Sequence, residues 1–240
     1  MKQNAFFRGV ADGFPICLGY LSVAFAFGIF AVGQGLSVWE TVLISLTNVT
    51  SAGQLAGVPI MVGGGTLIEM AASQFIINLR YALMSVSLSQ KLDRGFTLPH
   101  RMAVAFVNTD EVFAVASSQK GLITRPYQYG LILTPYFGWA LGTLLGAVAG
   151  DILPEIVTSS LGIAIYGMFI AIVIPEAKAS RATALCAGIS VALSCLFYYV
   201  PVLSRVPSGF VIILCAVTAS AILAAAAPLP MENGEEDTHE

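Results

Sequence analysis

Long apolar stretches dominate the chain and are separated by short polar links. They cover residues 14–33, 42–62, 66–88, 102–118, 128–149, 156–175, 182–203 and 208–227. Each is near or above the roughly 17–20 apolar residues that a membrane-spanning helix requires. A transmembrane barrel would instead show short segments of alternating hydrophobicity. The pattern predicts an all-α, polytopic transmembrane helical bundle with seven or eight membrane segments.

The third stretch, residues 66–88, is apolar and yet carries Glu69, Gln74, Asn78 and Arg80. On a helix, Gln74 and Asn78 lie along one stripe, whereas Glu69 and Arg80 lie along another, more than a right angle away. A helix with two polar stripes cannot face lipid broadly, so we place it inside the bundle. An unpaired arginine there costs at least ~2.5–3.5 kcal/mol. Arg80 is therefore expected to pair with a carboxylate.

Small and polar residues interrupt the second stretch over residues 47–57, which include Ser51, Gly53 and Gln54. Such a segment is tolerated at membrane depth only if it packs against protein or lines a watery cavity. Discontinuous helices of this type often supply substrate sites in transporters. A tight helix interface built from small residues is the alternative. In either case, this segment is not expected to be a regular lipid-facing helix.

The fourth stretch has Asn108, Asp110 and Glu111 at its centre. Two adjacent carboxyl groups are costly at membrane depth, so the segment is expected to be re-entrant, broken or packed against the protein interior near Arg80. Neighbouring helical residues point about 100° apart, so only one of the two carboxylates can face Arg80. The other is available to bind a proton or a substrate amine.

Composition agrees with a membrane protein, because 10% of the 240 residues are charged and 57% are hydrophobic. The net charge is −3, and the basic residues are scattered singly, which gives no support for nucleic-acid binding. The cysteines lie in apolar stretches without metal-ligand spacing, so we predict no disulfide, no metal and no cofactor. Nucleotide-binding loops, zinc-protease motifs and Ser/His or Cys/His constellations are missing from the sequence, so we do not expect an enzyme.

Loop charges leave the topology open. Eight crossings with the amino terminus inside place six basic residues inside and four outside. If residues 102–118 do not cross, seven crossings with the amino terminus outside give seven inside and three outside. The seven inside are then Lys91, Arg94, Arg101, Lys120, Arg125, Lys178 and Arg181. Residues 35–46 and 150–161 share a weak sequence similarity, and under seven crossings the two segments would form an inverted repeat.

We expect residues 1–227 to form one transporter domain. The acidic end, residues 228–240, has the composition of a disordered tail.

Several sequence blocks together resemble a known family. They are Gly13-Phe14-Pro15, Gly19-Tyr20, Ser51-Ala52-Gly53-Gln54, Asn78-Leu79-Arg80-Tyr81-Ala82-Leu83-Met84-Ser85 and Thr109-Asp110-Glu111-Val112-Phe113. In this order and spacing they resemble the AzlC family, the large subunit of bacterial and archaeal branched-chain amino-acid exporters. The resemblance is strong over the first half of the chain and extends over the rest only in hydropathy.

The resemblance implies export of leucine, isoleucine, valine or similar amino acids such as methionine, driven by a proton or ion gradient. It also implies a multi-pass protein of the cell (inner or plasma) membrane that works with a small AzlD-type membrane subunit. One position departs from the family, because Tyr81 stands where relatives often have a histidine. Proton binding would then fall to Asp110, Glu111 or Glu69.

A zwitterionic substrate needs a cation or a helix amino terminus for its carboxylate, an anion for its ammonium group, and apolar walls for its side chain. A channel or importer for another small solute and a non-transporting scaffold subunit are the alternative functions. The residues predicted for substrate binding or the transport path are Ser51, Gly53, Gln54, Gln74, Asn78, Arg80, Asn108, Asp110 and Glu111.

Overall fold

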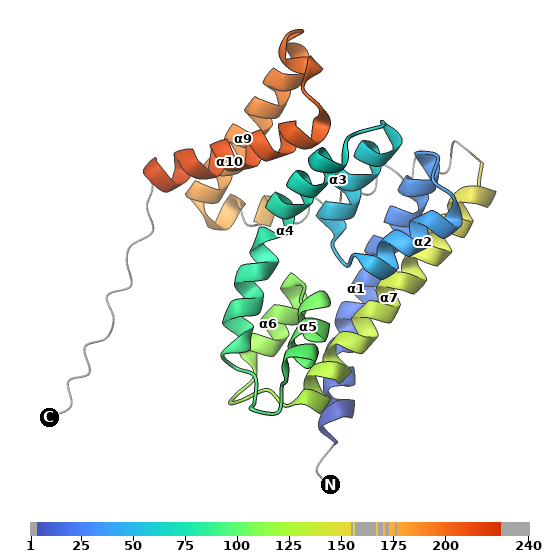
Figure 1. The fold of residues 1–240 in the computed structure, drawn as a ribbon, viewed down its shortest axis with the longest axis vertical. Coiled ribbons are helices and arrows are strands. Elements are labelled where there is room, and N and C mark those ends of the chain that lie inside the picture. The colour runs from blue at the N-terminus through green and yellow to red at the C-terminus, as the bar shows by residue number, and fades with distance from the viewer. Residues whose placement is uncertain are drawn as a thin grey trace, which may run out of the picture. The chain divides into compact units, whose positions relative to one another are not determined.

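The computed structural model describes residues 4–154, 156, 167, 170, 173–175 and 177–226. These residues form the helices shown in Figure 1 and one isolated bridge between Leu92 and Ile123, so the all-α prediction is confirmed for them. The helices are α1 (Ala5–Gly33), α2 (Val38–Thr47), α3 (Ser51–Val62), α4 (Leu67–Ser89), α5 (Leu98–Phe106), α6 (Asp110–Ser118), α7 (Arg125–Ile152), α9 (Arg181–Tyr199), the short 3₁₀ turn η1 (Leu203–Arg205) and α10 (Ser208–Ala226).

Among the described residues, α1, α7, α9 and α10 are long and apolar enough to cross a membrane. α4 has 23 residues, but it carries the polar groups noted above and falls outside this set. The stretch expected over 156–175 lies largely outside the described residues, as do the second of the two similar segments and the tail over 228–240. The number of crossings and the inverted repeat therefore stay predictions.

Two compact units divide the chain, Met1–Ile170 and Ala171–Glu240. In the second unit, α9 and α10 pack against each other. The candidate site lies entirely in the first unit, which the following paragraphs describe.

Glycines let α1 and α7 pack backbone to backbone. A Cβ added at Gly9 would lie 2.1 Å from the Tyr127 carbonyl oxygen, and one added at Gly146 would lie 2.0 Å from the Phe25 carbonyl oxygen. Small residues permit this close approach between membrane helices. Early residues of α1 meet early residues of α7 and late residues meet late ones, so the two helices are parallel (Figure 1). The chain over 34–124 must therefore return to the end of the unit at which α1 begins.

The second apolar stretch turns back on itself. α2 ends at Thr47, and α3 begins at Ser51. The Gln54 Nε2 donates to Ser45 Oγ at 2.8 Å, which joins the two helices near the turn, while α2 packs against α7 and α3 against α4. Residues 48–50 interrupt the stretch, so residues 47–57 do not form one regular lipid-facing helix, as predicted. The whole stretch forms a re-entrant hairpin, α2–α3, in place of the crossing that its hydropathy indicated.

The fourth apolar stretch is also broken, because residues 107–109 separate α5 from α6. The Arg101 Nη1 at the start of α5 donates to Ser89 O at 3.2 Å. Just beyond α6, the Lys91 Nζ donates to Gln119 O at 3.0 Å. Since Ser89 and Lys91 both lie at the end of α4, α5 begins and α6 ends at the same end of the unit. The prediction of a broken or re-entrant segment is confirmed, and this segment forms a second re-entrant hairpin, α5–α6.

Arg8 lies at the same end as these links, because its guanidinium donates to the Gln119 side chain while Lys91 donates to the Gln119 backbone. The seven-crossing and the eight-crossing counts both placed Arg8 on the side opposite Lys91, and that placement is wrong. The physical reason is that the α2–α3 hairpin does not cross, which changes the side reached by every later link.

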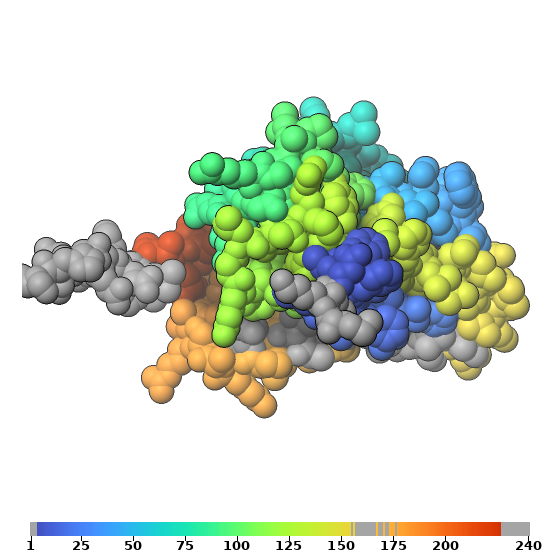
Figure 2. Space-filling view, turned by 90° about the horizontal axis from the view of Figure 1, so that it is seen from below, coloured from blue at the N-terminus to red at the C-terminus, as the bar shows by residue number. Residues whose placement is uncertain are grey.

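Basic residues gather at this end of the unit, which we call the basic end. Figure 2 looks onto it and shows the start of α1 beside the chain that leads into α7. The opposite end is formed by the links 34–37, 63–66 and 150–154, which contain no lysine or arginine. The basic end carries Arg8, Lys91, Arg94, Arg101, Lys120 and Arg125.

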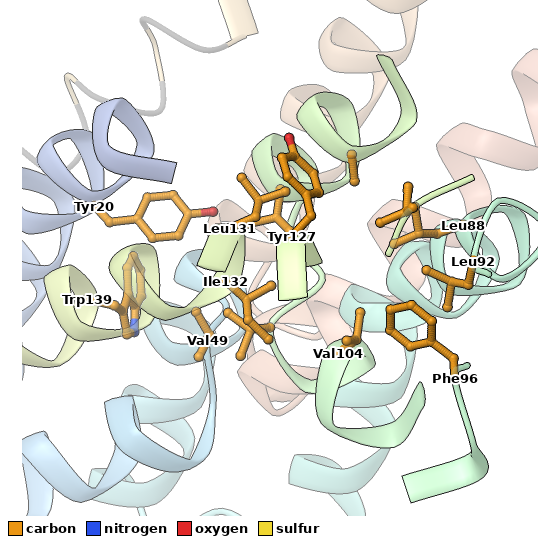
Figure 3. Close-up of a cluster of buried hydrophobic side chains, with 14 of the residues drawn as sticks. Tyr20, Val49, Leu88, Leu92, Phe96, Val104, Tyr127, Leu131, Ile132 and Trp139 are labelled. Carbon is orange, nitrogen blue, oxygen red and sulfur yellow. The ribbon is translucent and has the colours of Figure 1, made fainter. Parts of the chain in front are cut away.

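One buried apolar cluster holds both hairpins against α1 and α7 (Figure 3). The rings of Tyr20 and Trp139 meet edge to face at 5.3 Å between centroids. Val49 from the turn of α2–α3 and Val104 from α5 belong to the same cluster. Figure 3 shows the Tyr20 hydroxyl pointing away from α1 into the cluster. The two hairpin turns are therefore fixed by a common core.

Candidate functional site

A cavity of about 230 Å³ lies where the turns of the two hairpins meet the middle of α4, and we call it the central cavity. It is somewhat smaller than the roughly 300–1,000 Å³ of drug-sized ligand sites. Its walls are mixed, with polar side chains from the two turns and α4 beside apolar ones from Val49 of the α2–α3 turn and from Ala105 and Phe106 of α5. The lining residues are Thr47, Asn48, Val49, Thr50, Asn78, Tyr81, Ala105, Phe106, Asn108 and Thr109.

Two helices begin at the central cavity. Thr50 caps α3 by accepting from the Gly53 N–H at 3.4 Å, and Thr109 caps α6 by accepting from the Val112 N–H at 3.4 Å. The first N–H groups of a helix have no partner within the helix, and the helix dipole adds partial positive charge there. Both hairpins therefore present an anion-attracting end to one space.

α4 contacts both hairpins through the stripe that the sequence predicted. The Gln74 Nε2 donates to the Gly53 carbonyl oxygen at 2.8 Å, and the Asn78 Nδ2 donates to Gln74 Oε1 at 3.1 Å. Two turns further along α4, Ser85 Oγ accepts from the Asn108 Nδ2 at 3.0 Å. The same face of α4 thus binds α3 at one end and the break before α6 at the other.

Arg80 pairs with Asp110, which confirms the predicted pairing and identifies the carboxylate. The Arg80 guanidinium also donates to the Tyr81 hydroxyl at 3.0 Å and lies 4.8 Å from the centre of the Tyr81 ring. Tyr81 in turn donates to Thr50 Oγ1 at 3.4 Å. The pair is less enclosed than expected, because the two charged side chains are 48% and 45% exposed. The Arg80–Asp110 pair lies beside the central cavity, because Arg80 contacts Tyr81 and Tyr81 lines the cavity.

Glu111 faces α1 instead. The Tyr20 hydroxyl lies 2.5 Å from Glu111 Oε2 and 2.5 Å from Thr109 Oγ1. A hydroxyl has one proton, so Tyr20 donates to the carboxylate and accepts from Thr109. The first turn of α6 is therefore tied to α1 by one carboxylate and to α4 by the other.

The structure brings most of the predicted site residues together. Asn78 and Asn108 line the central cavity. Ser51 begins α3 directly after Thr50. Gln54 is an exception, because it lies between α2 and α3 and joins Ser45 rather than the cavity. Gly53, Gln74, Arg80 and Asp110 contact lining residues or one another, whereas Glu111 contacts Tyr20 of α1, which does not line the cavity.

The residues predicted for the site did not include Thr50, Thr109, Tyr20 or Tyr81. Thr109 had a usable signal, because a threonine directly before acidic residues is typical of a helix start. Thr50 follows a small-residue run without such acidic neighbours, so its signal is weaker. Tyr20 lies far from Glu111 in sequence, and no local pattern indicates their contact.

The fold and the site define a helical membrane protein in which two re-entrant hairpins meet at a central polar cavity. Residues 15–153 match the family described as AzlC protein. An uncharacterized membrane protein of Archaeoglobus fulgidus is 35% identical over 197 residues, which cover 81% of this chain and 86% of that protein. The chain belongs to the AzlC family.

Two further relatives are membrane proteins by name. The inner membrane protein YgaZ of Escherichia coli is 28% identical over 188 residues, 75% of this chain and 76% of that protein. An uncharacterized membrane protein of Helicobacter pylori is 24% identical over 157 residues, 62% of this chain and 68% of that protein. No solved structure matches the chain. Family membership and the apolar helices identify a membrane protein with a transporter-like role.

Proposed function

We propose that this protein exports branched-chain or similar apolar amino acids through the central cavity. The observation that carries the proposal is the meeting of two broken segments, entering from opposite ends, at a cavity with two helix amino termini. Secondary transporters bind substrates at such midplane sites, with half-helix amino termini directed at anionic groups. Polar walls suit the charged part of an amino acid, and Phe106, Val49 and Ala105 supply an apolar part for its side chain.

The proposed switch is the Arg80–Asp110 pair. A substrate carboxylate competes for the guanidinium and a substrate ammonium competes for the carboxylate, so binding weakens the contact between α4 and α6. Because Tyr81 links Arg80 to Thr50, a change at the pair reaches the turn of the α2–α3 hairpin. This gives substrate binding a route to both hairpins.

A proton gradient is the proposed driving force, and Glu111 is the proposed proton-binding group. Its carboxylate is the second of the adjacent pair and is not engaged by Arg80, whereas Asp110 is. Protonation of Glu111 would change its contact with Tyr20 and so the position of α6 against α1. The family resemblance supports a small AzlD-type membrane subunit as partner, and we include it in the proposal. We propose transport rather than catalysis.

Export is tested in cells that lack their own exporter and are fed a leucine- or valine-containing dipeptide. Expression of this protein with its small partner should lower the intracellular pool of the released amino acid, and an uncoupler should abolish that effect. Asn78→Ala should weaken export at equal membrane abundance, because Asn78 lines the cavity. Gln90→Ala, an exposed amide at the end of the same helix, is the matched control. If the unmutated protein, expressed with its small partner, leaves the intracellular amino-acid pool unchanged, the proposed substrate class is refuted.

A further inference from the structure

A second, smaller cavity lies between α4 and α5 and adjoins the central cavity. Its volume is about 30 Å³, which is room for roughly one or two water molecules and far too little for an amino acid. We call it the seam cavity, and its lining residues are Ser85, Leu88, Ser89, Leu92, Arg101, Val104, Ala105 and Asn108. Ala105 and Asn108 also line the central cavity, so the two cavities share part of one wall.

The seam cavity extends from the central cavity toward the basic end. Along α4, the lining residues of both cavities lie three or four positions apart, so they occupy one face of the helix. From the central cavity outward they are Asn78, Tyr81, Ser85 and then Leu88 and Ser89. Ser89 is the last residue of α4, at the basic end. One face of α4 thus leads from the central cavity to the basic end.

Polar and apolar contacts close this route. Where the two cavities meet, the Asn108 Nδ2 donates to Ser85 Oγ at 3.0 Å and joins the opposite walls. Beyond this bond, three side chains of the buried apolar cluster in Figure 3 line the seam cavity, and they are Leu88, Leu92 and Val104. Such side chains exclude a charged solute unless the walls move apart.

Arg101 closes the outer end of the seam cavity. Its Nη1 donates to Ser89 O at 3.2 Å, and its Nε donates to Phe96 O at 3.3 Å. Water or a carboxylate can replace a backbone carbonyl as the partner of a guanidinium, so these contacts can be broken and remade during transport. The positive charge of Arg101 also attracts the carboxylate of an amino acid at the basic end.

We infer that α4 and α5 separate along the seam cavity to form the passage between the central cavity and the basic end, and that this passage is closed in the present structure. The inference rests on the proposed export function and adds to it the route that joins the substrate site to one side of the membrane. The proposed switch supplies the opening step, because weakening the Arg80–Asp110 pair releases α4 from the α5–α6 hairpin. Asn108 and Ser85 then lose their bond, and the amino acid passes between the two walls.

Labelling of single cysteines in membrane vesicles tests the passage. The protein has its four native cysteines replaced and its small partner present, and it carries either Ser85→Cys or Arg94→Cys, which marks the basic end. A charged, membrane-impermeant thiol reagent should label Ser85→Cys only from the side on which it labels Arg94→Cys. Leucine should raise the labelling rate of Ser85→Cys about five-fold or more, because transport repeatedly opens the passage. Labelling from the opposite side alone, or a rate that leucine leaves unchanged while it is exported, would overturn the inference.

Val86→Cys is the matched control, because Val86 is the next residue of α4, is exposed and lines neither cavity. It should react slowly with the charged reagent and show no response to leucine. Val104→Cys repeats the test from the opposite wall and leaves the bond between Asn108 and Ser85 intact. Equal responses at Ser85→Cys and Val86→Cys would indicate a general loosening of α4 and would contradict a passage along one face.

A bulky group attached to Ser85→Cys should block the passage without occupying the central cavity. Modification of the purified protein should abolish leucine export after reconstitution while leucine binding remains. The same modification of Val86→Cys should leave both export and binding intact. Loss of binding together with export would place Ser85 at the substrate site itself and would refute a separate passage.

The same experiments separate this inference from the proposed function. Unimpaired leucine export by fully modified Ser85→Cys would refute the passage and leave the export function standing. If the unmodified protein exports no leucine, the proposed substrate class fails, and labelling of Ser85→Cys without leucine decides the inference. Reaction from the side that labels Arg94→Cys would then support the passage, and inertness of Ser85→Cys would refute it.

Discussion

Adjacent carboxylates at the start of α6 have separate partners. Asp110 pairs with Arg80 of α4, and Glu111 accepts from Tyr20 of α1. This division follows from helix geometry, because consecutive side chains point about 100° apart. Both carboxylates also lie in the first turn, where negative charge is stabilised by the helix dipole. The sequence predicted that only one could reach Arg80, but it could not identify which, because the rotation of α6 is set by distant packing.

We expect Arg80→Ala to destabilise the protein by about 1–3 kcal/mol, less than the roughly 3–5 kcal/mol of a fully buried pair because this one is half exposed. The loss arises because Asp110 keeps its charge without its partner. Arg80→Gln combined with Asp110→Asn should recover part of it, since removing both charges leaves neither unpaired. Thermal unfolding of the purified protein measures both effects.

Arg94→Ala is the control for this experiment, because Arg94 is an exposed arginine in the α4–α5 link. It should leave the unfolding temperature unchanged. A double variant no more stable than Arg80→Ala would show that the charge imbalance is not the cause.

Glu111→Gln should abolish proton-driven transport while leaving exchange of substrate across the membrane in place. Glutamine keeps the size of the side chain and a contact for Tyr20, but it cannot bind and release a proton. Proteoliposomes measure both activities, with an imposed pH gradient in one case and labelled leucine exchange in the other. Asp151→Asn, at the exposed end of α7, should retain both. Proton-driven transport by Glu111→Gln would exclude Glu111 as the coupling group.

The broken helices are the elements that the sequence predicted best. Runs of small and polar residues over 47–57 and adjacent charges at 110 and 111 are unfavourable in a continuous membrane helix, and both stretches are broken. The direction of the chain after each break was not predictable. Hydropathy reports how many apolar residues follow one another, whereas a reversal depends on contacts such as that between Gln54 and Ser45.

Packing between α1 and α7 requires glycine at particular positions, and Gly28 provides a sharp test. A Cβ there would lie 2.4 Å from the Thr143 carbonyl oxygen and 2.5 Å from the Ala147 nitrogen, both backbone atoms that cannot move aside. We expect Gly28→Ala to destabilise the protein by about 1–3 kcal/mol, as overpacking does. The unfolding temperature of the purified protein measures the change.

Gly19→Ala is the matched control on the same helix, because a Cβ at Gly19 would meet nothing within 4 Å. It should be neutral or stabilising by up to about 1 kcal/mol, since alanine favours the helix over glycine. Equal effects of the two alanines would mean that helix propensity, rather than close packing, governs these positions.

For the whole first unit, the distribution of charge depends on the path of the chain. Counting basic links along the sequence requires knowing which stretches cross, and the reversal of α2–α3 alters that count. Once the path is known, Arg8 joins the other basic residues at one end, and the links at the opposite end have neither lysine nor arginine. Cytoplasmic loops carry an excess of lysine and arginine. The positive-inside rule therefore predicts that the basic end faces the cytoplasm.

This orientation predicts the labelling of two single-cysteine variants made after the four native cysteines are replaced. Trp39→Cys, at the end opposite the basic end, should react with a membrane-impermeant thiol reagent in intact cells. Arg94→Cys, at the basic end, should react only after the membrane is made permeable. Both side chains are exposed, so a difference in labelling reflects the side of the membrane rather than burial. Labelling of Arg94→Cys and protection of Trp39→Cys in intact cells would reverse the orientation. Export through the central cavity would then begin from the end that carries Glu40 and Asp151.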